Sequence, residues 1–134
     1  MISRHPRQGG LPSAGELAED VTTVRAAYQA LEVGDEEALT RYLDPQVEWV
    51  HPVVTRLPFD GVLRGLPSVL RSAFRRGEDG TGGPRVSADT FLEIGDGVLV
   101  AGRFLRDGVK EGEPFLHECS VRGGRIERIR EYPA

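Results

Sequence analysis

The feature that most constrains this chain is a change of hydrophobic period near its middle. Between residues 13 and 43, and again between 67 and 77, apolar side chains recur at spacings of three and four, as in helices that bury one face. From residue 85 onward they alternate with polar side chains, and short glycine-containing turns separate the runs. Helices followed by strands that pair in order predict the α+β class, with the helices packed on a curved, mainly antiparallel sheet.

Capping residues set the limits of three predicted helices. Ser13 begins a capping box for the first helix, and Gly34 ends it. Asp35 caps a second, short helix, and Pro67 begins a third that runs to residue 77. Residues 53–65 lack a clear period and are expected to form a loop. The predicted strands span residues 46–51, 86–94, 98–106, 115–122 and 125–132.

Length and charge limit the classes of function. A chain of 134 residues predicts one domain, which we expect at residues 13–134 after a flexible arm at residues 1–12. A net charge of -4 provides no basic surface for nucleic acid, and no apolar stretch is long enough to span a membrane. With Cys119 as the single cysteine, no intramolecular disulfide can form, and we expect a cytoplasmic protein.

Two histidines are the candidate catalytic residues. His51 follows Val47 and Trp49 at alternate positions, and His117 precedes Cys119 in the same way, so each imidazole shares a strand face with apolar side chains. An imidazole can donate or accept a proton near neutral pH. If both faces line one cavity, that cavity can carry out acid-base chemistry.

Five short motifs resemble the NTF2-like superfamily, in particular its SnoaL-like and steroid-isomerase-like branches. The resemblance covers roughly residues 21–132. It implies an NTF2-like cone with an enclosed pocket for a small hydrophobic molecule, cofactor-free chemistry and a homodimer. The motifs lie at residues 28–35, 47–52, 61–65, 95–98 and 124–126.

The steroid-isomerase-like branch has a proton-shuttling aspartate at the position that matches His51. Its hydrogen-bond donor to the oxyanion, often a histidine in SnoaL-like proteins, matches His117. Its oxyanion-hole tyrosine would fall at Ala27, one residue before Tyr28. Because imidazoles replace carboxylates, the resemblance implies general acid-base chemistry but not the steroid reaction itself.

The limonene-epoxide-hydrolase branch offers a second comparison. Its polar first-strand residues match Trp49 and His51, its arginine matches Arg103 and its final-strand aspartate matches Glu131, but Leu105 stands where its other aspartate would be. SnoaL-like polyketide cyclisation requires only a base and a donor for the enolate oxygen, and His51 and His117 can fill these roles.

The remaining candidates have structural alternatives. Trp49 and Tyr28 are expected in the wall or core, and Cys119 is expected as a buried thiol. Glu131 is expected to face solvent in a run of mixed charge, whereas Arg103 can point to either face of its strand. No ligand spacing indicates a metal, and no phosphate loop indicates a nucleotide.

Three functions stay open. The first is a cofactor-independent cyclase or isomerase of a small, largely apolar carbonyl compound of polyketide or terpenoid type. In it, His51 and His117 are catalytic, and Trp49, Tyr28, Arg103, Cys119 and Glu131 bind substrate. The second is a non-catalytic binding protein for a hydrophobic metabolite. The third is a dimeric assembly module.

Overall fold

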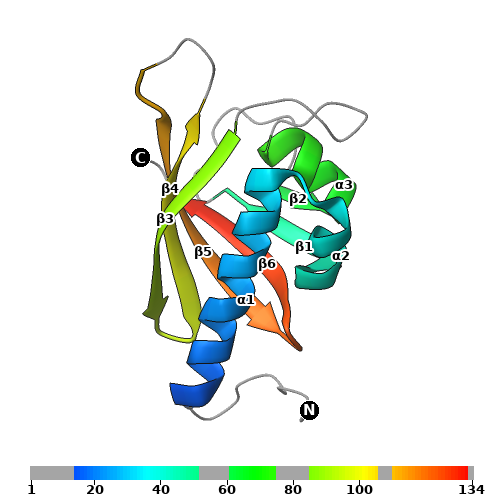
Figure 1. Cartoon of the computed structure of the whole chain (residues 1–134). Helices are drawn as coiled ribbons and strands as arrows, with labels where there is room; N and C mark the ends of the chain where they lie inside the picture. The colour runs from blue at the N-terminus through cyan, green and yellow to red at the C-terminus, as the bar shows by residue number, and fades with distance from the viewer. Residues whose placement is uncertain (1–13, 52–60, 75–84, 106–109, 133–134) are drawn as a thin grey trace.

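The computed structural model describes residues 14–51, 61–74, 85–105 and 110–132. Three helical segments pack on one six-stranded, curved and mostly antiparallel sheet (Figure 1). This is the predicted α+β class. The flexible arm, the Ser13 cap and the last turn of the third predicted helix lie outside the described residues.

The two N-terminal helices follow their sequence signals. Helix α1 (Ala14–Val33) ends at Gly34, whose φ of 74° favours a residue without a side chain. Helix α2 (Glu36–Tyr42) is capped by Asp35, whose carboxylate accepts a hydrogen bond from the Ala38 N–H at 3.1 Å. Both predicted boundaries are confirmed.

The third helix differs from its prediction. Helix α3 (Leu66–Ser68) has Pro67 in its first turn as expected, but it passes at once into a π-helical turn, η1 (Val69–Ala73). The Phe74 N–H closes this turn on the Val69 carbonyl at 3.2 Å. The wider turn ends at Phe74, which is 1 % exposed and packs in the core.

The strands form one sheet in the order β2-β1-β6-β5-β4-β3. The C-terminal meander is antiparallel, as predicted, and β1 joins it by pairing parallel to β6. The prediction of a loop was wrong for β2, which extends the sheet beyond β1. The strand bounds are β1 (Leu43–Val50), β2 (Val62–Arg64), β3 (Arg85–Ile94), β4 (Gly97–Leu105), β5 (Glu113–Arg122) and β6 (Arg125–Tyr132).

The beginning of β1 also differs from the prediction. The strand was expected to begin at residue 46, yet it starts at Leu43 and runs through Asp44. The first residues of the strand are irregular. The Asp44 carboxylate accepts a hydrogen bond from the Gln46 N–H at 2.8 Å, and the register with β6 shifts between Leu43 and Glu48.

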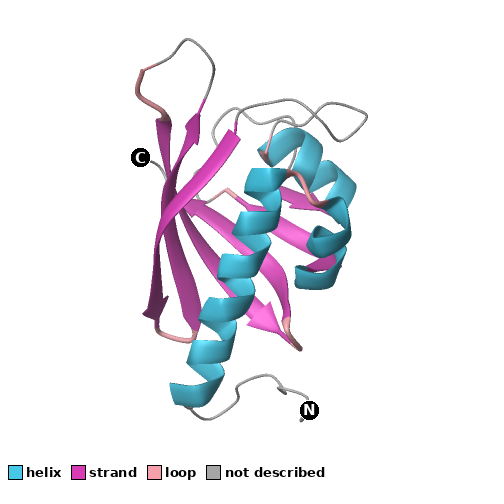
Figure 2. Ribbon diagram, in the orientation of Figure 1, coloured by secondary structure: helices cyan, strands magenta, loops and turns pink. Residues whose placement is uncertain are grey.

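The helices cover a single face of the sheet (Figure 2). Helix α1 crosses in front of the sheet, and α2 and α3 lie beside it over the β1 end (Figure 1). Val24, Tyr28 and Leu31 of α1 are each at most 1 % exposed, which confirms their predicted helical stripe. The core therefore lies between α1 and this face.

Candidate functional site

Three polar side chains lie side by side on the helix-covered face of the sheet. In the register of the sheet, Glu131 of β6 pairs with His117 of β5, and Arg130 pairs with Val50 of β1. His51, which follows Val50, therefore comes beside Glu131 on the other side. The Glu131 carboxylate lies 3.7 Å from His51 Nε2 through Oε1 and 3.5 Å from His117 Nε2 through Oε2.

Helix α1 provides a fourth polar group. The Tyr28 hydroxyl lies 2.7 Å from His117 Nδ1 and 3.6 Å from Cys119 Sγ. Tyr28, His117 and Cys119 are each at most 1 % exposed, whereas the side chains of Glu131 and His51 are 26 % and 31 % exposed. The polar groups thus run from the core toward the surface in the order Tyr28, His117, Glu131, His51.

Aromatic rings surround His117. Phe115 stacks on it with ring centroids 4.3 Å apart, and Trp49 meets it edge to face at 4.8 Å. The rings of Phe74 and Phe104 follow at 6.1 Å and 6.4 Å. These rings exclude water from the imidazole and make this end of the site apolar.

Burial changes the protonation equilibria of the inner groups. It lowers the pKa of His117, because the charged imidazolium is poorly solvated there, and the Glu131 carboxylate opposes this shift only in part. Burial also raises the pKa of Tyr28 well above its ordinary value and that of Cys119 to about 12. At neutral pH the inner part of the site is therefore uncharged.

One ring nitrogen of His117 lacks a hydrogen bond. The carboxylate of Glu131 is near enough to affect its charge, but at a long separation of 3.5 Å it does not form a hydrogen bond with Nε2. We therefore treat this pair as a polar contact. Within the described part of the chain, the Nε2 atom is the buried side-chain nitrogen or oxygen without a hydrogen-bond partner. Such groups are rare in native proteins, and a ligand is one common reason for them.

The structure brings most of the predicted site residues together. His51, His117, Trp49, Tyr28, Cys119 and Glu131 form one contiguous group, with Glu131 between the histidines rather than in solvent.

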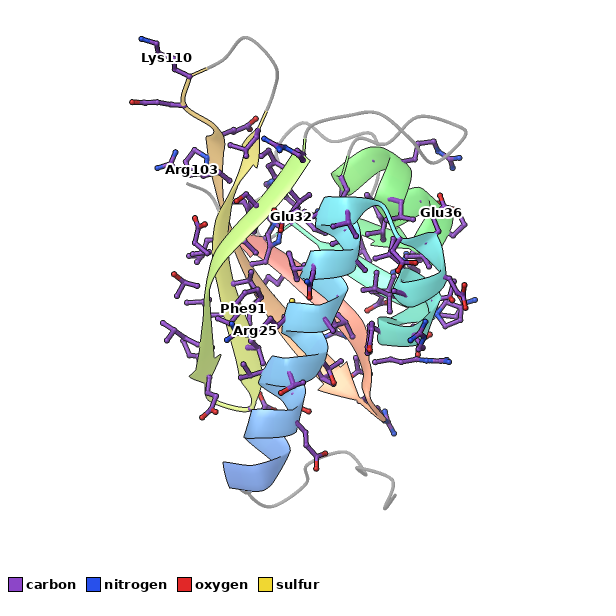
Figure 3. All side chains as sticks on the ribbon, in the orientation of Figure 1. Arg25, Glu32, Glu36, Phe91, Arg103 and Lys110 are labelled. Atoms are coloured by element: carbon purple, nitrogen blue, oxygen red, sulfur yellow. The ribbon has the colours of Figure 1, made fainter. Side chains whose placement is uncertain are left out.

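Arg103 does not join this group. Its neighbours Gly102 and Phe104 are buried, so Arg103 points to the opposite face of β4, where it is exposed and donates a hydrogen bond to the Gly112 carbonyl at 3.0 Å. Figure 3 shows it on the side of the sheet away from the helices.

The phenylalanines of the aromatic wall were not predicted as part of the site. Phe115 shares the face of His117 two residues earlier, so strand alternation was a signal for it. Phe104 and Phe74 come from β4 and the end of η1, and the chain carries no local signal that they meet His117. Among the described residues, no group of three or more His, Cys, Asp or Glu side chains is placed to hold a metal ion.

Several solved structures share this fold. Bal32a from a soil-derived mobile gene cassette is 25% identical over 87% of this chain and 90% of its own, with a TM-score of 0.67. TerC, co-crystallised with polyporic acid, is 23% identical over 87% of this chain and 92% of its own, at 0.63. An NTF2-like protein from Burkholderia xenovorans is 24% identical over 92% of both chains, at 0.57. The fold is therefore NTF2-like.

Comparison with curated proteins gives no match. The family model of the SnoaL-like domain matches residues 24–129, a range that includes Tyr28, both strands that flank β6 and most of β6 itself. The protein therefore belongs to the SnoaL-like domain family.

Proposed function

We propose that this protein is a cofactor-independent cyclase or isomerase that acts by general acid-base catalysis on a small, largely apolar carbonyl compound. One observation carries the proposal, namely that a single carboxylate, Glu131, lies within 3.7 Å of two imidazoles, His51 and His117, beside a buried aromatic wall. Membership of the SnoaL-like family supports it.

The two imidazoles have different surroundings, which supports different roles. His51 is partly exposed, so it can take up a proton and return it to solvent or product. His117 is fully buried and has a free ring edge toward Glu131, so it can donate a hydrogen bond to an oxygen that becomes negative.

The reaction needs no outside oxidant or reductant. His51 removes a proton from the carbon next to a carbonyl, and the electron pair of the C–H bond forms the enolate, whose oxygen accepts a hydrogen bond from His117. The enolate carbon then attacks a second carbonyl carbon, which closes a ring. Alternatively, in a compound with a β,γ C=C bond, the γ carbon takes the proton back from His51 and the C=C bond moves to the α,β position, which isomerises the compound. In the first case the proton on His51 passes to the new alkoxide.

The test is proton exchange into a simple ketone. We expect the wild-type protein to accelerate deuterium uptake at the α carbons of 2-tetralone in D2O, followed by proton NMR. His51→Ala and His117→Ala should each reduce this acceleration by about two to four orders of magnitude. Glu118→Gln, on the opposite face of β5, serves as the control and should exchange like the wild type. Exchange that neither histidine variant alters would contradict the proposal.

A binding function is the alternative that one observation favours. TerC, which shares the fold, was co-crystallised with polyporic acid. Native mass spectrometry separates the two functions, since a non-catalytic protein would hold an apolar molecule and release it unchanged after long incubation.

The proposal includes a cytoplasmic homodimer. Leu92 and Ile94 of β3 are 54 % and 47 % exposed, and such apolar side chains on an edge strand support contact with a second copy. Sedimentation equilibrium should give a dimer, and Leu92→Glu combined with Ile94→Glu should shift it toward the monomer. Among the described residues, no helix is both long enough and apolar enough to cross a membrane.

A further inference from the structure

We propose that Glu131 fixes the buried His117 as a neutral imidazole with its proton on Nε2, so that His117 is a permanent hydrogen-bond donor to a substrate oxygen and does not transfer its proton. The tautomer follows from contacts within the protein. Only the identity of the acceptor, a carbonyl or enolate oxygen, rests on the proposed function. Glu131 is thus a positioning residue for His117.

The Tyr28 hydroxyl alone does not select a tautomer of His117. A phenol can donate a hydrogen bond to a bare Nδ1, which places the proton of the ring on Nε2. It can also accept from Nδ1–H and donate its own proton to Cys119 Sγ, 3.6 Å away. Both arrangements satisfy Tyr28, so the choice must come from the other side of the ring.

Glu131 removes this ambiguity. An ionised carboxylate can only accept hydrogen bonds, and its Oε2 lies 3.5 Å from Nε2 of His117. A proton on Nε2 is attracted to this oxygen, whereas a lone pair there would face negative charge in a buried site. The Nε2–H tautomer is therefore the stable one, and Tyr28 responds by donating to Nδ1.

The groups that face His117 also set its charge. Tyr28 of α1 and Cys119 of β5 are uncharged at neutral pH, since burial raises both pKa values. The aromatic rings from β1, η1, β4 and β5 carry no charge. Among the described residues that contact His117, Glu131 is then the charged group, and its carboxylate also lies 3.7 Å from His51 Nε2.

This assignment explains the unpartnered nitrogen. An Nε2–H that is buried and makes no hydrogen bond is an unsatisfied donor, which lowers the stability of the folded protein. A substrate oxygen that approaches it gains a hydrogen bond without any rearrangement of the ring. The two histidines therefore have different roles. His51 transfers the proton, and His117 donates a hydrogen bond to the substrate oxygen.

The test is NMR of the full chain labelled with 15N-histidine, in which long-range correlations identify the protonated ring nitrogen. The chain has three histidines, so His5→Gln, His51→Gln and His117→Gln assign the signals. We expect the His117 signals at pH 7 to show a protonated Nε2 and a bare Nδ1. An Nδ1–H tautomer or an imidazolium at this pH would overturn the inference.

Three variants test which residue determines the tautomer of His117. Glu131→Leu removes the carboxylate and should give His117 a mixture of both tautomers, whereas Tyr28→Phe should keep the proton on Nε2. Glu118→Gln, the carboxylate next to His117 in sequence but on the opposite sheet face, should match the wild type. A pure Nε2–H tautomer in Glu131→Leu would show that Glu131 is not responsible, which would also overturn the inference.

These spectra are independent of turnover. If the tautomer is as stated but no ketone exchanges, the proposed function fails and the inference stands. If exchange depends on both histidines but His117 carries its proton on Nδ1, the inference fails and the proposed function stands.

Discussion

The Tyr28 hydroxyl and His117 Nδ1 lie 2.7 Å apart although 89 positions of the chain separate them. The contact joins helix α1 to the middle of the sheet and is fully buried. It therefore connects the packing of the first helix directly to the imidazole of the candidate site, so that a change in one should be measurable in the other.

Tyr28→Phe should destabilise the protein. The substitution keeps the ring, which packs against Phe74, Phe91 and Phe115, and removes only the hydroxyl. It leaves His117 Nδ1 buried without its partner, which costs about 1–3 kcal/mol. Urea unfolding followed by circular dichroism gives the free energy of unfolding. The control is Tyr42→Phe on the half-buried face of α2, which should change it by less than about 0.5 kcal/mol. Equal effects in both variants would contradict the role of the contact.

Stability should fall below about pH 6.5 because of His117. Burial lowers its pKa from the ordinary 6.5, so the unfolded chain takes up this proton first as the pH falls. The contribution is complete above pH 6.5 and is lost as the pH falls toward the pKa of the folded protein, with a slope of at most about 1.4 kcal/mol per pH unit.

The measurement is urea unfolding of the wild type and His117→Gln between pH 5.5 and 7.5. His117→Gln should lack the part of the pH dependence of stability that comes from His117. The substitution changes no carboxylate, so the contribution of the acidic groups is the same in both proteins. His51→Gln, which removes the partly exposed histidine, is the control and should keep most of the slope. Parallel curves for the wild type and His117→Gln would refute the assignment.

Cys119 should be unreactive until the protein unfolds. Its pKa of about 12, against an ordinary 9.0, makes the thiolate roughly a thousandfold scarcer at pH 8, and its burial blocks reagents as well. Because it is the single cysteine of the chain, all thiol labelling can be attributed to it. Iodoacetamide labelling followed by mass spectrometry should be slow in buffer and fast in 8 M urea. Fast labelling of the folded protein would mean that Cys119 is accessible.

Gly102→Ala should disturb the aromatic wall. A Cβ at Gly102 would come 2.7 Å from Cζ of Phe115, the ring that stacks on His117, and 2.8 Å from Cα of Ala88 on the neighbouring strand. The register of β3 and β4 already shifts next to Ala88, so the backbones are close here. Overpacking of this kind costs about 1–3 kcal/mol or more.

Thermal unfolding and the proton spectrum of the aromatic rings test this together. We expect a lower melting temperature and shifted Phe115 and His117 signals in Gly102→Ala. Ala101→Ser, one residue earlier and on the opposite face of β4, is the control and should leave both unchanged. A melting temperature equal to that of the wild type would show that the strands can move apart without cost.

Local signals predicted most of the fold. Gly34, Asp35 and Pro67 marked helix boundaries correctly, because capping depends on a few adjacent residues. Strand β2 escaped prediction because three residues are too few to show a period. The π-helical turn before Phe74 also escaped it, since its apolar spacing is close to that of an ordinary helix.

The sequence by itself determined which side chains share a strand face. Successive side chains of a strand point to opposite sides, so Trp49 and His51 had to lie together, as did Phe115, His117 and Cys119. This is a local property of the backbone, and it was sufficient to select both histidines.

Only the tertiary structure decided that these faces meet at Glu131. The parallel pairing of β1 with β6 joins strands that are about 80 positions apart in the chain, and it brings His51 to the Glu131 that the β5–β6 hairpin sets opposite His117. Register depends on packing across the whole core, and a shift of one residue would turn Glu131 to the other face. For the same reason, the place of Arg103 outside the site and of Tyr28 within it could not be read from alternation alone.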